Sequence, residues 1–295
     1  MRRKKRALKS LVPAGFGLFI FIICAASFLY LLYSETREKP QEKDSHKREL
    51  AKRLDRGIGT KKEALILKKK KAAADRKQLA IVIDDLGYDL VVIDQLLEIE
   101  APITFSILPH LIHSRDAAEK VHRAGREVLL HLPMEPHDYP RRDPGKGALF
   151  VKMTTAEMTK CLSDDIDSVP FASGVNNHMG SRFMEEEEKL EIIFRQLGGK
   201  GLFFVDSLTT GKSKARELAA TTGIGLIERD FFIDNGRNAD LTYREIIGHM
   251  SEPGGWRQRL LIGHPYPSTL AALKRVFSRA ASLDVDIVPV SRLLK

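Results

Sequence analysis

The chain has few cysteine and aromatic residues: its 295 residues include two cysteines, one tryptophan and 7% aromatic residues in all. Cys24 lies in an apolar N-terminal stretch, so Cys161 is left alone in the remainder of the chain. No disulfide can therefore form within that remainder, and its fold must depend on an apolar core. Cysteine usage allows an extracytoplasmic location without demanding one.

Two common catalytic motifs are also missing. Gly223–Gly225 lacks the surroundings of a dinucleotide-binding fingerprint, and its glycines indicate a turn into a strand. Gly263–Pro267 has no serine after its glycine, so it is not the nucleophile elbow of a serine hydrolase. No glycine-rich phosphate loop occurs elsewhere, which weighs against phosphoester chemistry.

Positive charge is scarce in the larger part of the chain, although the net charge is +9. Residues 1–78 hold 22 of the 48 Lys and Arg residues but only 8 of the 39 Asp and Glu residues. Residues 79–295 therefore hold 26 basic and 31 acidic residues and are mildly acidic. A nucleic-acid-binding domain would carry a basic face of its own, so we expect no nucleic-acid ligand.

The N-terminal segment predicts a membrane anchor. Residues 1–10 are strongly basic, and the 23 residues from Leu11 to Tyr33 carry no charge, more than the roughly 20 that span a bilayer as a helix. The basic cluster would stay cytoplasmic, which places the rest on the periplasmic side of a bacterial inner membrane. A cleavable signal peptide ending near Cys24–Ser27 is the alternative. The charged residues 34–78 are expected to form a solvated linker.

From residue 79 onward, short apolar runs alternate with segments of helical period. This alternation predicts a parallel sheet with helical crossovers, and its length favours a distorted (β/α)7-8 barrel over residues 79–295. An open doubly wound sheet is the alternative. The expected strands are 79–84, 103–108, 127–132, 172–177, 201–206, 224–229, 259–264 and 285–290. The expected helices are 113–124, 156–168, 185–197, 214–221, 242–250 and 268–282.

Asp and His recur where the predicted strands end. The apolar run Leu79–Ile83 leads directly into Asp84 and Asp85, and burying two like charges together is costly unless a cation or a shared proton compensates. In a barrel such strand ends gather at one rim, where catalytic groups lie. The other strand-end positions are His110, His131, His178, Asp206, Asp230 and His264.

This mixture of Asp and His suits Zn²⁺ or a similar divalent cation in an open catalytic site. Asp84 and Asp85 cannot share one role, because successive side chains on a strand point to opposite faces. One of them can bind the metal while the other serves as a base. Ser181 and Ser207 lie near histidines, but serine catalysis would leave the paired aspartates unexplained.

Five segments together resemble the divergent polysaccharide deacetylase family, over about residues 79–294. They are Ile83–Gly87, His131–Glu135, Gly174–Ser181, Phe204–Ser207 and Ile262–Pro265. The resemblance implies a distorted (β/α) barrel and kinship with metal-dependent carbohydrate esterases.

By that resemblance, Asp84 would be the base, Asp85 a metal ligand and His264 the acid. The esterases carry a second histidine four residues after the first, whereas His131 is followed by Glu135. We expect Asp85, His131 and His178 as ligands, with Glu135 as the alternative third ligand. Glu135, Asp206 and Asn177 are expected to contact substrate or to orient neighbouring groups.

The reaction that follows is zinc-dependent hydrolysis of N-acetyl groups on an envelope polysaccharide related to peptidoglycan. Several aromatic residues are expected in loops near the rim, where sugars would bind: Tyr88, Tyr139, Phe183, Trp256 and Tyr266. The changed second motif supports a different hypothesis, a non-catalytic envelope protein that binds glycan or protein through a degenerate site. A different metal hydrolase, acting on phosphoester or ester bonds, is the third hypothesis.

Overall fold

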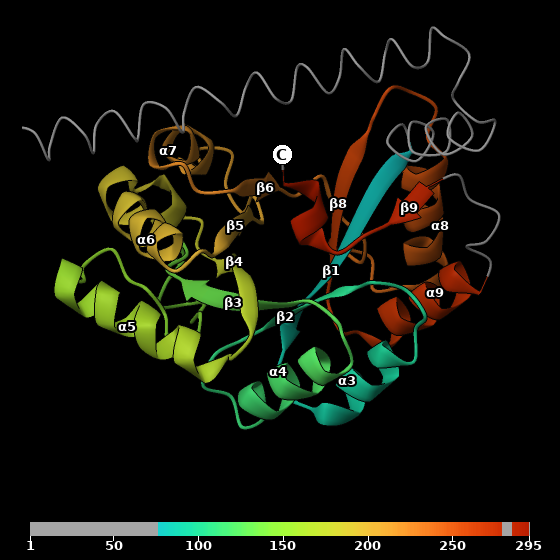
Figure 1. Ribbon diagram of the computed structural model, residues 1–295, viewed down its shortest axis with the longest axis horizontal. Coiled ribbons are helices and arrows are strands. Elements are labelled where there is room, and N and C mark those ends of the chain that lie inside the picture. The colour runs from blue at the N-terminus through green and yellow to red at the C-terminus, as the bar shows by residue number, and fades with distance from the viewer. Residues whose placement is uncertain (1–75, 279–284, 295) are drawn as a thin grey trace, which may run out of the picture. The chain divides into compact units, whose positions relative to one another are not determined.

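The computed structural model describes residues 76–278 and 285–294, which form a curled parallel sheet with helices on its outside (Figure 1). Hydrogen-bonded strands follow the order β6-β5-β4-β3-β2-β1-β8-β7, and β9 pairs separately with β1. The strands are β1 (Lys77–Leu86), β2 (Thr104–Ile107), β3 (Val128–Met134), β4 (Ala172–Met179), β5 (Phe203–Asp206), β6 (Leu226–Glu228), β7 (Phe231–Phe232), β8 (Gln258–Gly263) and β9 (Val285–Ile287). The predicted parallel, barrel-like architecture is confirmed.

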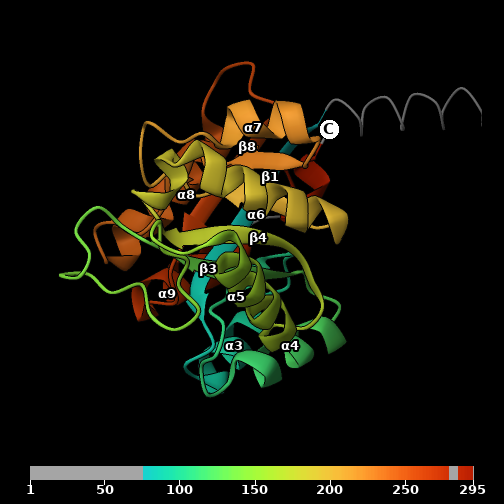
Figure 2. The same cartoon turned by 90° about the vertical axis from the view of Figure 1, so that its left-hand side faces the viewer.

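Helices join successive strands and lie against the outer face of the sheet. They are α3 (Leu90–Leu97), α4 (Ser114–Arg123), α5 (Thr155–Ser168), α6 (Glu187–Gly199), α7 (Ala215–Thr222), α8 (Ala239–Ser251) and α9 (Pro267–Phe277), with short 3-10 turns η1 (Phe183–Glu185) and η3 (Val290–Leu293). Figure 2 shows α5, α6 and α7 side by side on this surface. Helix α5 begins with a full capping box between Thr154 and Glu157, which satisfies two backbone N–H groups at its start.

Helix α3 was absent from the predicted elements. Asp89 caps it by accepting a hydrogen bond from the backbone N–H of Val91 at 2.8 Å. Ile93 and Leu96 are its buried residues, a spacing of three that fits one face of a helix. An N-cap aspartate followed by this spacing is the sequence signal that would have identified the helix.

The strands divide their side chains between two cores. Leu79, Ile81 and Ile83 face the helices, whereas Ala80 and Val82 face the interior of the curl. The inner core also contains Leu129, Phe203, Val205, Ile227, Leu260 and Ile262, together with Val290 and Leu293 from η3. Because successive side chains alternate, Asp84 continues the inner face of β1, and this alternation decides which polar residues can meet at the rim.

The barrel is not closed, which refines the prediction of a closed or nearly closed one. Strand β6 pairs with β5 and strand β7 with β8, but β6 and β7 do not pair with each other. The chain steps from one strand to the other through Arg229 and Asp230. Strand β1 begins at Lys77, so the end of the predicted linker already belongs to the sheet.

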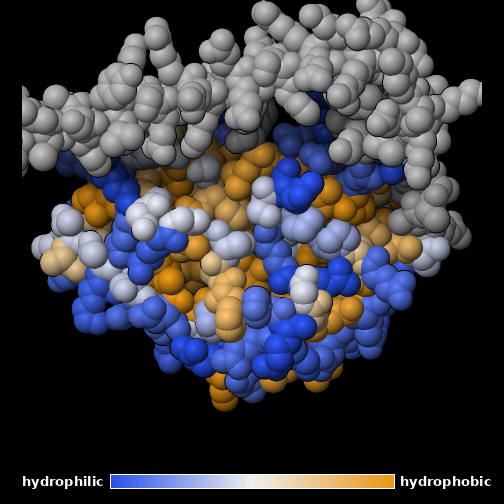
Figure 3. Space-filling model, in the orientation of Figure 1, coloured by the Kyte–Doolittle hydropathy of each residue, from blue (hydrophilic) through white to orange (hydrophobic). Residues whose placement is uncertain are grey.

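The face in Figure 3 carries hydrophilic residues along its outer margin and hydrophobic residues between the helices. Across residues 76–278 and 285–294, no helix has the length and apolar character needed to cross a membrane. The predicted basic segment 1–10, the anchor 11–33 and residues 34–75 of the linker lie outside the described residues.

Candidate active site

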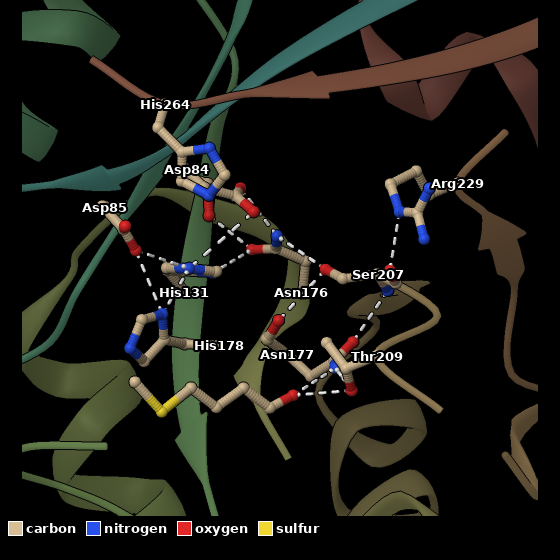
Figure 4. A network of polar contacts seen from close by, with 12 residues as sticks. Asp84, Asp85, His131, Asn176, Asn177, His178, Ser207, Thr209, Arg229 and His264 are labelled. Atoms are coloured by element: carbon tan, nitrogen blue, oxygen red, sulfur yellow. Dashed lines mark hydrogen bonds and ion pairs between the residues drawn. The ribbon is translucent and has the colours of Figure 1, made fainter. Parts of the chain in front are cut away.

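Side chains from four strand ends converge at the carboxyl rim of the curled sheet (Figure 4). Asp84 and Asp85 come from β1, His131 from β3, His178 from β4 and His264 directly follows β8. Parallel strands make this possible, since all of their carboxyl ends lie at one edge. These are the five residues to which sequence analysis gave the central roles.

Asp84 and Asp85 reach the rim by different routes. Asp84 lies on the inner face of β1 and is 2% exposed. Asp85 follows it and would point outward, but its backbone has a φ of 56°, in the left-handed region. The register between β1 and β2 also shifts between Ile83 and Leu86. This local turn brings both carboxylates to the same site.

Asp85, His131 and His178 present three ligand atoms to one another. Asp85 Oδ1 lies 3.1 Å from His131 Nε2 and 3.0 Å from His178 Nδ1. The two ring nitrogens are 3.0 Å apart. In a tetrahedral zinc site with bonds of about 2.0–2.1 Å, ligand atoms would be roughly 3.3 Å from each other. Two ring nitrogens and one carboxylate oxygen at these separations fit a divalent cation such as zinc.

The electrostatics of the three residues support this assignment. Burial raises the pKa of Asp85, but the hydrogen bonds and charges of His131 and His178 lower it further, so Asp85 stays ionised. Burial lowers the pKa of His131, while the charge of Asp84 and the hydrogen bond to Asp85 outweigh it and raise the pKa. The pocket therefore attracts positive charge, which a cation can supply in place of a proton.

Asn176, a residue that sequence analysis did not single out, connects the two halves of the site. It lies on the inner face of β4, fully buried, opposite His131 in the β3–β4 register. Its Oδ1 lies 3.0 Å from His131 Nδ1 and also accepts a hydrogen bond from the Ser106 hydroxyl. Its Nδ2 donates to Asp84 Oδ1 at 2.8 Å. Because a carbonyl oxygen accepts, His131 Nδ1 must carry the proton, which leaves Nε2 free to bind a metal.

Asp84 is held as a buried acid beside the three clustered groups. Burial raises its pKa most strongly, and the charge of Asp85 adds to this, while His131, His264 and Asn176 lower it. The net shift is upward. Its second oxygen lies 3.8 Å from His131 Nε2, on the side facing the cluster. A carboxylate with a raised pKa is suited to accept a proton near neutral pH.

His264 is positioned by Asp234, which sequence analysis also missed. Asp234 is 3% exposed; its Oδ1 lies 3.1 Å from His264 Nδ1, and its Oδ2 accepts hydrogen bonds from the His264 backbone N–H and the Thr269 hydroxyl. Burial lowers the pKa of His264, but Asp234 and the charges of Asp84 and Asp85 raise it overall. His264 can thus hold a proton while its other ring nitrogen remains available.

A cavity of about 260 Å³ adjoins these groups. Asp84, His131, His178 and His264 line it on one side. The remaining lining residues are Pro136, Asp138, Arg142, Asn177, Met179, Ser181, Ser207, Thr209 and Phe232. Four of the five rim residues can therefore face one small ligand in this cavity, while Asp85 contacts two of them, His131 and His178.

Glu135, Asp206 and Asn177, which were expected to contact substrate or to orient neighbouring groups, lie outside the cluster of possible metal ligands. The Glu135 carboxylate accepts hydrogen bonds from Arg182 and from the backbone of Val151, both at 2.7 Å, so it holds loops and lies outside the cluster of possible metal ligands. Asp206, which lies on the outer face of β5, accepts from Ser213 at 2.6 Å. The contacts of Glu135 favour His178 over Glu135 as the third metal ligand. The contact of Asp206 with Ser213 indicates that Asp206 orients the loop that follows β5.

Asn177 also supports a loop. Its Oδ1 accepts a hydrogen bond from the Ser207 backbone N–H at 2.8 Å, and its Nδ2 donates to the carbonyl of Met179 at 2.9 Å. It lines the cavity while joining β4 to the loop after β5. The position fits the expectation that it contacts substrate or orients its neighbours.

The other strand-end residues do not join the site. His110 Nε2 lies 2.7 Å from Asp165 of α5, and Asp230 accepts a hydrogen bond from the backbone N–H of Leu260.

Two of the aromatic residues that were predicted to lie in loops near the rim are not placed to contact a ligand there. Phe183 is fully buried, and Trp256 lies beneath Lys77 and Arg259 near the amino ends of β1 and β8.

Tyr88, Tyr139 and Tyr266 remain candidates for contact with a sugar. Tyr88 is 64% exposed and Tyr139 is 38% exposed, while the Tyr266 ring lies 5.5 Å from that of His264. Each follows a strand end that contributes to the rim.

Fold and site together define a curled, parallel α/β domain with a candidate metal centre at the carboxyl ends of its strands. Residues 81–294 match the divergent polysaccharide deacetylase family, and the chain belongs to it. The predicted family is thereby confirmed. The match covers nearly all of the described residues and contains every residue placed in the site.

Two relatives share the same region. The uncharacterized protein YibQ of Escherichia coli (strain K12) is 34% identical over 220 residues, which is 74% of this chain and 67% of that protein. An uncharacterized protein of Haemophilus influenzae is 30% identical over 218 residues, 74% of this chain and 77% of the relative.

Among solved structures, the uncharacterized protein ATU2773 from Agrobacterium tumefaciens C58 has a similar fold. Its TM-score is 0.67 at 23% identity, covering 74% of this chain and 89% of that one. At this identity the likeness concerns the fold alone.

Proposed function

We propose that the protein is a metal-dependent hydrolase that removes N-acetyl groups from an envelope polysaccharide. The observation that carries this proposal is the convergence of Asp85, His131 and His178 on one point, with Asp84 and His264 beside the same cavity. Three protein ligands that leave a position open are typical of a catalytic rather than a structural metal site.

Zinc is the proposed cation, since Zn²⁺ binds imidazole nitrogens and carboxylate oxygens and keeps an open position in catalytic sites. When bound, such a metal polarises the carbonyl oxygen of the acetyl group and lowers the pKa of a water molecule towards ~7.

Asp84 is the proposed general base. Asn176 holds one of its oxygens, and the other faces His131, so the carboxylate is oriented before any substrate arrives. Its raised pKa lets it take a proton from the attacking water and retain it during the reaction.

His264 is the proposed general acid, which donates its proton to the departing amine. Asp234 holds Nδ1 and the backbone N–H of this residue, so the ring cannot turn away from the cavity. Backbone amides near Met179 and Gly180 are candidates to stabilise the oxyanion, because Met179 lines the cavity where its backbone turns to a φ of 54°.

The proposed location points to the substrate. If residues 11–33 anchor the chain in the inner membrane with residues 1–10 in the cytoplasm, the catalytic domain lies in the periplasm. N-acetylated sugars of peptidoglycan are then the nearest polymeric substrate.

A non-catalytic binding protein is the second candidate, and one observation favours it. Glu135 stands where related esterases carry a histidine, and its carboxylate is bound elsewhere. Asp85, His131 and His178 nevertheless complete a set of three ligands, so the loss of that histidine does not dismantle the site.

The test uses the full chain in detergent, with zinc content and acetate release measured on N-acetylated wall fragments. We expect one zinc per chain, lost in Asp85→Asn and His178→Ala but kept in Glu135→Gln. Zinc without acetate release would favour the binding protein. Absence of zinc from the wild-type chain would overturn both the site and the proposed activity.

A further inference from the structure

The barrel is open between β6 and the first residues of β8. Strand β7 pairs with the upper part of β8, through Phe231 opposite Leu261 and Phe232 opposite Ile262. The chain reaches β7 from β6 through only two residues, Arg229 and Asp230. Among the described residues, no strand lies between β6 and the first residues of β8, on the side of β8 that β7 occupies further along.

A comparable position elsewhere in the same sheet is filled. Strand β2 pairs with the upper part of β1, from Val82 onward, and β9 pairs with Lys77–Leu79 at its lower end. Three residues of extended chain thus pair with the first residues of β1, next to β2. Beneath β7, no described segment does the same.

Some main-chain groups on both sides of this gap have no partner within the described part of the chain. Arg229 N–H bonds to Asp206 O, so the odd-numbered residues of β6 face β5, and Leu226 and Glu228 face the gap. On β8, the carbonyl of Leu260 accepts from Asp230 N–H at 2.9 Å, so the even-numbered residues face the gap. For the main-chain groups of Leu226, Glu228 and Gln258, no partner lies in residues 76–278 or 285–294.

A cavity of about 810 Å³ occupies the gap (Figure 1 shows β6 and β8 on either side of the C-terminal turn η3). Leu260, Leu293 and Leu294 provide apolar surface, and Leu294 packs against Gly225. The charged residues of the lining include Arg216 and Arg259, which are paired with Glu228 and Glu252. The cavity offers apolar contact and free main-chain groups rather than unpaired charge.

We propose that this gap, bounded by β6 (Leu226–Glu228) and by Gln258–Leu260, binds an extended segment of a partner polypeptide as an added parallel strand. Only an extended backbone offers donors and acceptors on both of its edges at the spacing of a sheet. About three residues would fill the position, as β9 does beside the first residues of β1. Main-chain hydrogen bonds would supply affinity, and an inward apolar side chain would contact Leu293 and Leu294.

The proposal is independent of the deacetylase site, since none of its residues belongs to the metal cluster. The test uses isotope-labelled full chain in detergent and the peptide acetyl-Thr-Val-Thr-Val-Thr-amide, whose side chains alternate between apolar and polar. We expect saturable shifts of the amide resonances of Leu226, Glu228 and Gln258. The peptide acetyl-Thr-Pro-Thr-Pro-Thr-amide, which cannot donate at two positions, should leave them unchanged.

A pair of variants distinguishes strand addition from contact with a side chain. Glu228→Pro removes an N–H that faces the gap, so it weakens binding roughly tenfold without breaking the pairing of β6 with β5. Glu228→Ala loses the ion pair with Arg216 but keeps the N–H, and it should bind within about twofold of the wild type. Leu294→Lys places a charge against the inward side chain and weakens binding without touching either strand edge.

Three outcomes would overturn the proposal. The first is an absence of amide shifts at Leu226, Glu228 and Gln258 at millimolar peptide. The second is equal binding by Glu228→Pro and Glu228→Ala. The third is slow hydrogen exchange at Leu226 and Glu228 before any peptide is added, because the position would then already be filled from within the full chain.

Discussion

Two histidine–aspartate pairs lie after strand ends of this sheet, and only one of them serves the candidate site. His264 is held by Asp234 at 3.1 Å and lines the cavity. His110 is held by Asp165 at 2.7 Å, on the side of helix α5. Both histidines follow apolar strands in the sequence. Their difference shows that a candidate catalytic histidine is recognised by what faces its free nitrogen, and not by its position after a strand.

The second pair has the character of a structural contact. Asp165 is fully buried; burial and the charge of Asp164 raise its pKa to about 8. A Cβ atom on Gly147 would collide with Asp165 Oδ1, so the loop around Gly147 packs directly on this carboxyl group. The pair joins α5, the loop after β2 and the loop after β3.

The largest expected effect separates the two histidines by activity. His264→Asn removes the proposed acid, so acetate release should fall by about 10²–10⁴-fold. His110→Asn should change acetate release by less than about twofold. Zinc content is the control, since neither histidine belongs to the metal cluster. Equal losses of activity in both variants would remove the functional distinction between the pairs.

The next effect concerns the aspartate of the functional pair. Asp234 raises the pKa of His264, so Asp234→Asn should lower that pKa and favour the neutral ring. The proposed acid then loses its proton at lower pH, and the alkaline limb of the acetate-release profile should move to lower pH. Activity at neutral pH should fall by roughly ten- to a hundredfold, the range for partners that orient a functional histidine. An unmoved alkaline limb would show that Asp234 has no influence on the acid.

A third histidine extends the comparison to metal binding. Asn176 fixes the protonated nitrogen of His131, so Asn176→Ala should weaken zinc binding by roughly ten- to a hundredfold in competition with a chromophoric chelator. Asn177→Ala, its neighbour on the other face of β4, should bind zinc within about threefold of the wild type. If the two variants bind zinc equally well, the tautomer of His131 is set by something else.

The smallest effect is on stability and belongs to the structural pair. A raised folded-state pKa means that protonated Asp165 stabilises the fold at low pH, and that this contribution is lost as pH rises from about 4 to about 8. Asp165→Asn, which stays neutral, should therefore gain stability over the wild type between pH 5 and pH 9, by a few degrees in Tm. Asp167→Asn, a change at an exposed position of the same helix, is the control, because the charge of Asp164 itself contributes to the raised pKa of Asp165. A constant difference across this pH range would contradict the raised pKa.

Much of the site follows from alternation along the strands. Asp84, His131 and His264 share the inner face with Val82, Leu129 and Ile262, so the sequence placed them at one rim together. Asp206 follows Val205, which faces inward, and therefore points to the helices. Applying alternation to β5 would have removed Asp206 from the expected site.

Other parts of the site and fold depend on contacts between residues that are far apart in the sequence, which no local sequence pattern reveals. Asp165 meets His110 across 55 residues, and Asp234 follows β7, a two-residue strand that lies beyond the predicted strand at 224–229. The step from β6 to β7 also opens the barrel. Its cause is the pairing of β7 with β8, a contact between residues about 30 positions apart.

Asp85 shows how one position can be constrained twice. Its φ of 56° favours a few side chains, because Gly, Asn and Asp adopt the left-handed region more readily than other residues do. Its contacts with His131 and His178 require an anion, which excludes Gly and Asn. Aspartate meets both requirements best, since glutamate carries the charge but adopts the left-handed backbone conformation less readily. Random substitution of Asp85 should therefore yield fewer active variants than random substitution of its neighbours in the segment Ile83–Gly87.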